Sequence, residues 1–334
     1  MTATRIRQEP THRQAARDAE GLTYEEKLRT LSEGSVNQHF DPWTDIDWDA
    51  PEYAVDRTDP RWVLPEVDAL GRHPWYQALP LERQIEIGIA REANVAKVGL
   101  QFENVLIRGL MEYVVHLPND SAEFRYCTHE ATEETHHTQM FQEFVNRTGA
   151  DVPGGPRYFR VLSSFLSLAA GPLPEIFFVG VLAGEEPIDH MQKSILRSGG
   201  DLHPLFRRIM QIHVAEEARH ISFAHEYLVK RVGELGRVRR AVLSVAFPVI
   251  MRVLGDVIMV PSKELTRELG IPREVVDEVF WDSPEGRQTL RDLFSDVRML
   301  AEDLGLMNRV SRRVWRRLRI DGRPSRFRSE PAAA

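Results

Sequence analysis

The stretch EETHHTQMF, residues 133–141, places two carboxylates and two imidazoles within five consecutive positions. Glu134 and His137 are three residues apart, so a helix would carry both on one face. That face continues through mostly apolar residues: Cys127, Ala131, Thr138, Phe141 and Val145. Glu133 and His136 lie one residue out of phase, on a more polar face. We therefore predict that Glu134 and His137 point into the protein, and that the other pair lies beside them or at the surface.

A second stretch, IHVAEEARH (212–220), repeats this arrangement. His213, Glu217 and His220 are spaced i, i+4 and i+7, so they form one stripe of a helix. The stripe continues through apolar and aromatic residues: Phe206, Ile209, Met210, Ala224, Tyr227 and Leu228. We predict that this stripe faces a core. Glu216 is out of phase and is expected to face away from it.

Two further glutamates, Glu103 and Glu185, lie on apolar helical faces, where a carboxylate without a partner is costly to bury. Glu103 precedes Glu134 by 31 residues, and Glu185 precedes Glu217 by 32. Each half of the sequence therefore reads Glu, then Glu-x-x-His. Two such helix pairs form the dimetal bundle of ferritin-like proteins. We predict an all-α fold: a ferritin-like four-helix bundle core, additional C-terminal helices and an extended N-terminal arm.

The predicted centre holds two metal ions. Four carboxylates balance two divalent charges, and mixed carboxylate and imidazole ligation suits iron, with manganese as the alternative. His213 adds a third nitrogen to the minimal ligand set. The predicted metal ligands are Glu103, Glu134, His137, Glu185, His213, Glu217 and His220.

Around this core the chain divides into four predicted segments. Residues 1–20 are polar and form a loose tail, and residues 321–334 form a disordered tail. Residues 81–320 form the helical di-iron domain. Residues 21–80 form an extended arm that packs on the body, because free solvent is a poor environment for its four tryptophans: Trp43, Trp48, Trp62 and Trp75.

Helical periodicity and end signals predict the individual helices. The sequence DSAE (120–123) resembles a capping box, SGG (198–200) is a glycine stop signal, and Pro204 suits a first helical turn. The predicted helices span 81–117, 120–147, 157–169, 173–197, 204–233, 236–258, 273–280, 284–304 and 307–318.

Composition narrows the function classes. The net charge is −7, whereas a nucleic-acid-binding protein usually carries an excess of basic residues. The single cysteine, Cys127, excludes an internal disulfide and suits a reducing cytoplasm. No signal peptide is visible, and the apolar run 241–260 is interrupted by Pro248, Arg252 and Asp256, which favours a buried helix over a membrane span. We expect a cytoplasmic protein with neither nucleic acid nor membrane as a partner.

Four stretches resemble the AurF-like p-aminobenzoate N-oxygenase family: FEN (102–104), EETHHT (133–138), AGEEPID (183–189) and IHVAEEARH (212–220). The resemblance covers about residues 75–306, and His213 matches the family's additional histidine ligand. It implies a homodimeric di-iron oxygenase that uses O2 and oxidises an aryl amine. A carboxylate-bearing substrate would need an arginine, for which Arg291 and Arg298 are the candidates on the late helix.

Three alternatives remain open at this stage. A di-iron enzyme could instead hydroxylate or desaturate carbon. A metal-storage protein would have a shorter, self-assembling chain. A radical-generating subunit would need a tyrosine beside the ligands, and Tyr227 lies two helical turns after His220. No dinucleotide fingerprint is present, so an oxygenase of this kind would take electrons from an external donor.

Overall fold

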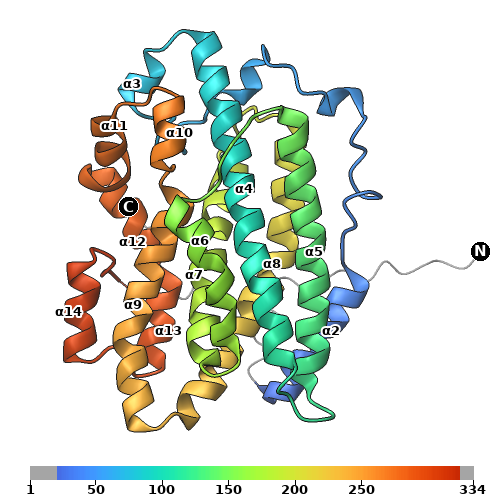
Figure 1. The fold of residues 1–334 in the computed structure, drawn as a ribbon, viewed down its shortest axis with the longest axis vertical. Helices are drawn as coiled ribbons and strands as arrows, with labels where there is room; N and C mark the ends of the chain where they lie inside the picture. The colour runs from blue at the N-terminus through green and yellow to red at the C-terminus, as the bar shows by residue number, and fades with distance from the viewer. Residues whose placement is uncertain (1–20, 324–334) are drawn as a thin grey trace, which may run out of the picture.

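The structure, a computed structural model, describes residues 21–323, and in this range it is helical and contains no strand (Figure 1). The predicted all-α class is confirmed. The predicted tail over 1–20 and residues 324–334 lie outside the described range. The helices are α2 (Tyr24–Asn37), α3 (Pro74–Gln77), α4 (Leu81–Val114), α5 (Ala122–Thr148), α6 (Arg157–Leu166), α7 (Pro174–Arg197), α8 (Pro204–Glu234), α9 (Arg237–Met259), α10 (Lys263–Glu268), α11 (Arg273–Asp277), α12 (Pro284–Leu293), α13 (Ser295–Asp303) and α14 (Arg309–Arg317).

Four long helices, α4, α5, α7 and α8, form the central bundle (Figure 1). α4 packs along α5, and α7 packs along α8. The buried apolar side chains form two clusters. On α5, Tyr126 and Ala131 of one cluster precede the EETHH stretch, whereas Phe141 and Phe144 of the other follow it. The same division recurs on α8, so the charged turns lie between two apolar layers.

Several predicted helix boundaries differ from the structure; α4, for example, ends at Val114 and not at residue 117. α5 begins at Ala122 and not at Asp120, because Asp120 has a left-handed φ of 63° and Ser121 makes no capping hydrogen bond. The predicted helix 284–304 is broken into α12 and α13 at Phe294, whose φ and ψ of −108° and 17° are not helical. The buried Phe294 ring packs against Gly255 of α9, and this contact accompanies the break.

The N-terminal arm starts with a helix, α2, that was not predicted from the sequence. Thr23 and Glu26 form a reciprocal capping box at the start of α2. Between α2 and α3 the chain forms turns and two short 3₁₀ helices, Pro51–Tyr53 and Pro60–Trp62. Trp62 is fully buried and stacks on His203, with ring centroids 4.0 Å apart.

The four tryptophans of the arm are not equally covered. Trp48 and Trp62 are buried and Trp75 is half-buried. Trp43 is 55% exposed, although its indole N–H donates to Gln139 on α5. The expectation that all four would avoid solvent is therefore wrong for Trp43.

The C-terminal helices cover one side of the bundle. α9 packs on α7 and on α14 (Figure 1). Within the described residues, the helical stretch Arg237–Glu268 is long and apolar enough to cross a membrane by length and composition, and half of its most apolar window is buried inside the protein. Residues 321–323, assigned to the disordered tail, contact the body, because Arg298 donates a hydrogen bond to the Arg323 carbonyl.

A close backbone contact joins the arm to the bundle. Gly88 of α4 lies against the Trp62 carbonyl, and a Cβ at position 88 would stand 1.8 Å from that oxygen. Only a residue without a side chain fits there. This contact brings the arm directly onto the helix that carries Glu103.

We predict that Gly88→Ala lowers the free energy of unfolding by about 2–3 kcal/mol, because the added methyl group forces the arm away from α4. The measurement is urea denaturation followed by circular dichroism. Gly233→Ala on α8 is the matched control, since no atom lies within 4 Å of a Cβ there. A Gly88→Ala protein as stable as the wild type would contradict the contact.

Candidate metal centre

All seven predicted ligand side chains converge in the interior of the four-helix bundle, and all seven are buried. They form two sets of four, and in each set one potential ligand atom per residue lies within 4.8 Å of the others. Glu217 belongs to both sets. The sets are Glu103, His137, His213 and Glu217, and Glu134, Glu185, Glu217 and His220.

Glu217 and Glu134 lie at the centre of this cluster. Glu217 Oε1 is 3.2 Å from His213 Nε2, 3.5 Å from His137 Nδ1 and 3.6 Å from His220 Nδ1. The two oxygens of Glu134 face different histidines, at 3.1 Å from His137 Nδ1 and 2.6 Å from His220 Nδ1. Each carboxylate is therefore placed to span the two halves of the site.

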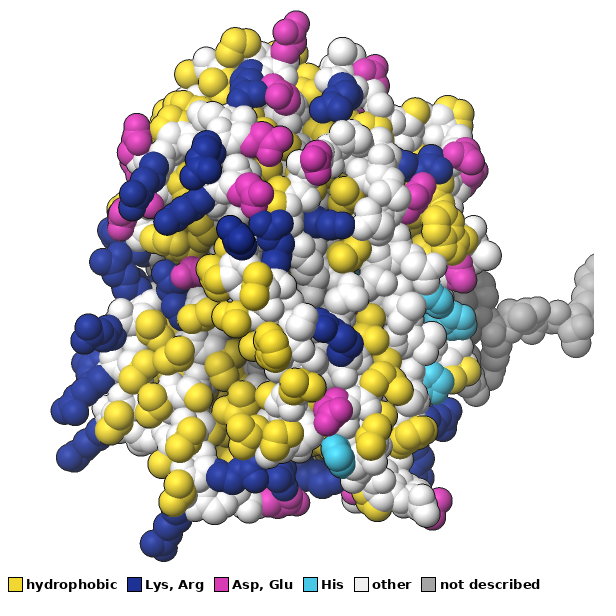
Figure 2. Space-filling model, viewed as in Figure 1, with side chains coloured by type: hydrophobic (Ala, Val, Ile, Leu, Met, Phe, Trp, Pro, Cys, Tyr) yellow, Lys and Arg dark blue, Asp and Glu magenta, His cyan; other side chains and the backbone are white. Residues whose placement is uncertain are grey.

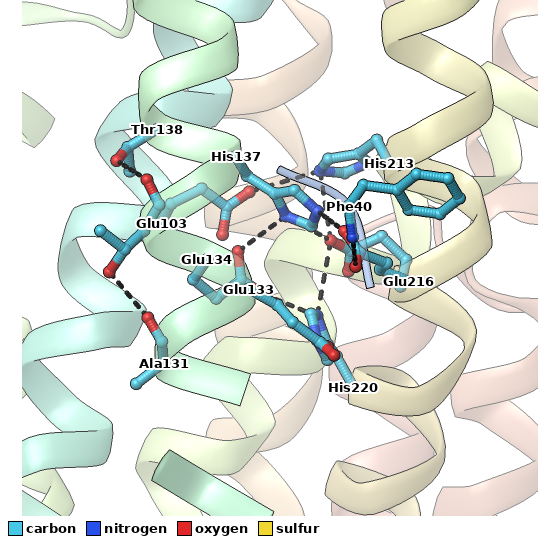
Figure 3. A network of polar contacts seen from close by, with 12 residues as sticks. Phe40, Glu103, Ala131, Glu133, Glu134, His137, Thr138, His213, Glu216 and His220 are labelled. Carbon is cyan, nitrogen blue, oxygen red and sulfur yellow. Dashed lines mark hydrogen bonds and ion pairs between the residues drawn. The ribbon is translucent and has the colours of Figure 1, made fainter. Parts of the chain in front are cut away.

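Each histidine has a second polar partner on its outer ring nitrogen. His137 Nε2 lies 2.8 Å from Glu216, and His220 Nε2 lies 2.7 Å from Glu133 (Figure 3). His213 Nδ1 lies 2.9 Å from the Gln192 side-chain oxygen. An outer N–H that donates to these oxygens leaves the inner nitrogen with a free lone pair, which is the tautomer a metal ligand requires.

Each of the two outer carboxylates contacts a histidine from the other half of the sequence. Glu133 on α5 contacts the histidine of α8, and Glu216 on α8 contacts the histidine of α5. Glu133 also accepts from Arg219, at 2.9 Å, and Glu216 accepts from the Phe40 backbone N–H of the arm, at 3.0 Å. Both glutamates are buried, so the prediction that Glu216 faces away from the core is wrong.

The residues fit a pair of divalent cations. Both oxygens of Glu185 and Glu217 and one oxygen of Glu134 are buried without a hydrogen-bond donor. Burial, together with neighbouring carboxylates, raises the pKa of Glu103 and Glu185 well above the ordinary value. A bound metal cation would stabilise buried carboxylates that have no hydrogen-bond donor and whose ionised form is otherwise disfavoured. A ligand set of carboxylates and imidazoles suits iron or manganese.

Two residues near the cluster, Gln192 and Glu130, were not predicted from the sequence, whereas His136 lies outside the ligand sets as expected. Gln192 lies on α7 without a distinctive motif around it. Glu130 is fully buried one turn before Glu134, its oxygens lack hydrogen-bond partners, and burial raises its pKa to about 8. His136 is half-buried and belongs to neither set of four.

The two arginines predicted to bind a substrate carboxylate lie elsewhere. Arg291 is exposed on α12. Arg298 is buried, but its guanidinium donates to the carbonyls of Ile320 and Arg323, at 2.9 and 3.0 Å. Neither residue lines the cavity beside the cluster. The prediction is therefore wrong for this cavity, because Arg298 anchors the C-terminal segment instead.

That cavity has a volume of about 210 Å³ and reaches three members of the cluster, Glu103, Glu185 and His213. Its remaining lining comes from apolar side chains and glycines of α4, α6, α7 and α9 and of the segment that follows α6. A small molecule inside it would touch the cluster from one side. The arrangement can therefore bring an organic substrate next to a bound metal pair.

We predict that Glu216→Gln lowers metal affinity about 10- to 100-fold, because it removes the negative charge that orients and polarises the His137 ring. Metal titration against a competing chelator measures this. Glu226→Gln, also on α8, is the control, since Glu226 pairs with Lys27 and not with the cluster. Unchanged affinity in Glu216→Gln would contradict the role given to the outer carboxylates.

We also predict that metal affinity falls as the pH falls. Burial alone would lower the pKa of His137, but the Glu134 and Glu216 carboxylates outweigh it and raise this pKa to about 10. In the metal-free protein His137 is therefore protonated at neutral pH, and the raised pKa values of Glu103 and Glu185 favour their protonated forms. Metal must displace these protons. Proton release on metal binding, measured with a pH indicator, checks this; binding without proton release would refute it.

Comparison with known proteins agrees with this site. The family described as p-aminobenzoate N-oxygenase AurF matches residues 21–305. The uncharacterized protein Rv0885 of Mycobacterium tuberculosis and the uncharacterized protein Mb0909 of Mycobacterium bovis are each 62% identical over 313 residues, covering 94% of this chain and 92% of theirs. With a family match over most of its length and all seven ligand positions gathered in one cluster, the chain belongs to the p-aminobenzoate N-oxygenase AurF family of oxygenases.

Proposed function

We propose that this protein is a di-iron oxygenase that uses O2 to oxidise a small organic molecule, and that the atom oxidised is the nitrogen of an aryl amine. The observation that carries the proposal is the pair of overlapping ligand sets that share Glu217 and border an apolar cavity. The metal ligands in this proposal are Glu103, Glu134, His137, Glu185, His213, Glu217 and His220.

The protein side chains supply geometry and electrostatics in this proposal. The carboxylates of Glu134 and Glu217 reach histidines from both halves of the bundle and would hold two ions close together. Glu133 and Glu216 keep His220 and His137 in the tautomer that binds metal. Two bound iron ions would supply the redox chemistry with O2 that amino-acid side chains lack.

The cavity positions the substrate. Glu103, Glu185 and His213 form its polar end, and the other lining side chains are apolar. A substrate held there has its reacting atom beside these three residues, and exclusion of water strengthens the local electrostatic interactions. Electrons would come from an external donor. We further propose that the enzyme is a cytoplasmic homodimer.

Oxidation at carbon is the second candidate. The apolar lining would accept a hydrocarbon group as well as an aromatic ring, so the cavity alone is compatible with hydroxylation or desaturation. Product analysis separates these reactions. Metal storage is less well supported, because storage does not need an apolar cavity beside the metal ligands. A radical-generating subunit would need a tyrosine beside the ligands, and the candidate, the buried Tyr227, packs against the aromatic rings of Tyr113 and Phe178.

We predict that the anaerobically reconstituted protein binds two iron ions per chain and consumes O2 with an aryl amine. Glu217→Ala should lose both ions, because Glu217 belongs to both ligand sets. His213→Ala should lose or weaken one ion, because His213 belongs to a single set. Iron analysis and Mössbauer spectroscopy measure these occupancies.

Glu226→Gln serves again as the control, and circular dichroism verifies that each variant is folded. A folded wild-type protein that binds no iron pair would refute the di-iron proposal. If it binds two iron ions and consumes O2 but forms only carbon-oxidised products, the nitrogen specificity alone is refuted. Full iron occupancy in Glu217→Ala would refute the shared role of that carboxylate.

A further inference from the structure

Away from the metal ligands, the described residues that line the cavity beside the cluster include no cationic group that could neutralise an acidic substrate. Among the described residues, the ionisable lining side chains are Glu103, Glu185 and His213, which the proposed function assigns to the metal ions. The other side chains that line it are aliphatic or aromatic, such as Phe102, Phe159, Phe177, Val181, Ile250 and Leu254. Neither an arginine nor a lysine is among them.

The arginines nearest to the lining residues along α4, α6 and α9 are engaged elsewhere. Arg108 on α4 is exposed and donates to the Asn104 carbonyl. Arg160 on α6 pairs with Glu264, at 2.5 Å. Arg252 on α9 pairs with Asp256 and stacks over the Trp281 ring, 4.6 Å from its centroid. Away from the metal ligands, a carboxylate in the cavity would therefore have no cationic side chain of the lining as a partner.

The entrance to the cavity is apolar as well. α6 covers it, and Phe165 and Leu166, both lining residues, are 65% and 40% exposed. Val161 and Leu162 of the same helix are also exposed. Figure 2 shows hydrophobic side chains gathered on this face over the region of α6 and α9. A molecule entering past α6 meets hydrocarbon first.

From these observations we infer that the substrate is an uncharged aryl amine whose end remote from the metal ligands is hydrocarbon, and that the site rejects aryl amines carrying a carboxylate there. The inference rests on the proposed function and separates this chain from the p-aminobenzoate named in the family description. Burying an unpaired carboxylate costs far more than burying a neutral group of the same shape.

The cavity volume sets the size of this substrate. A cavity of about 150 Å³ lined by Leu, Ile and Phe accommodates benzene. The volume of about 210 Å³ found here leaves space for one aromatic ring with a short alkyl substituent. The stacked rings of Phe102 and Phe159, with centroids 4.8 Å apart, form one aromatic wall.

Two probes with the same heavy-atom skeleton test the inference: 4-isopropylaniline and 4-aminobenzoate. Their binding to the iron-loaded protein is measured by calorimetry under nitrogen, so turnover does not interfere. We expect 4-isopropylaniline to bind at least about 100-fold more tightly, given the cost of an unpaired buried charge. Equal or tighter binding of 4-aminobenzoate overturns the inference, and so does the failure of both probes to bind.

A variant that adds a cation tests the physical cause. Leu254 is a half-buried lining residue of α9, so Leu254→Arg can place a guanidinium at the cavity wall. We expect Leu254→Arg to improve binding of 4-aminobenzoate at least about 10-fold, because the guanidinium would pair with the substrate carboxylate. We expect the same variant to weaken binding of 4-isopropylaniline. Leu254→Met is the neutral control and should retain the wild-type preference.

The outcomes distinguish this inference from the proposed function. Circular dichroism first verifies that both variants are folded; if Leu254→Arg is not, Ile250→Lys takes its place at the same wall. A folded cationic variant that gains no affinity for 4-aminobenzoate overturns the inference. A protein that binds two irons but prefers 4-aminobenzoate overturns the inference alone. A protein that prefers 4-isopropylaniline but holds no iron pair overturns the proposed function instead.

Discussion

Burial of charge inside the bundle is the constraint on which the rest of this structure depends. The cluster alone gathers four carboxylates and three imidazoles among the described residues, and their desolvation must be offset by partners. Burial raises the pKa values of Glu103 and Glu185, so that without metal their neutral, protonated forms are favoured and the cost of buried charge is reduced. The two apolar layers above and below the cluster hold these groups together in spite of their repulsion.

The same constraint explains the surroundings of the cluster. Each histidine needs an outer acceptor, and two of these acceptors are glutamates that need donors of their own. Arg219 serves Glu133, and the Phe40 N–H of the arm serves Glu216. The hydrogen bonds therefore extend from the cluster to the arm that packs outside the bundle. The arm is part of the site because it completes this chain of partners.

The i, i+3 and i, i+4 spacing predicted which residues of α5 and α8 share an inward face, and the matched separations of 31 and 32 residues added Glu103 and Glu185 and predicted the bundle. Relations between helices were not predictable in this way. Glu216 is out of phase on α8, yet it is buried because α5 and the arm cover that face. The break at Phe294 accompanies the packing of its ring on α9, and Arg298 is held by a carbonyl that comes later in the chain. Each of these depends on a partner remote in sequence.

The contact between Phe40 and Glu216 has a consequence for the sequence variation that the arm can accept. The donor is the backbone N–H, so the hydrogen bond itself does not require a phenyl ring at position 40. Nineteen of the twenty residue types can offer this donor, and proline alone lacks it. At position 40, any residue other than proline can therefore donate this hydrogen bond, within the limits that neighbouring packing sets, and proline alone would remove a donor that lies two hydrogen bonds away from His137.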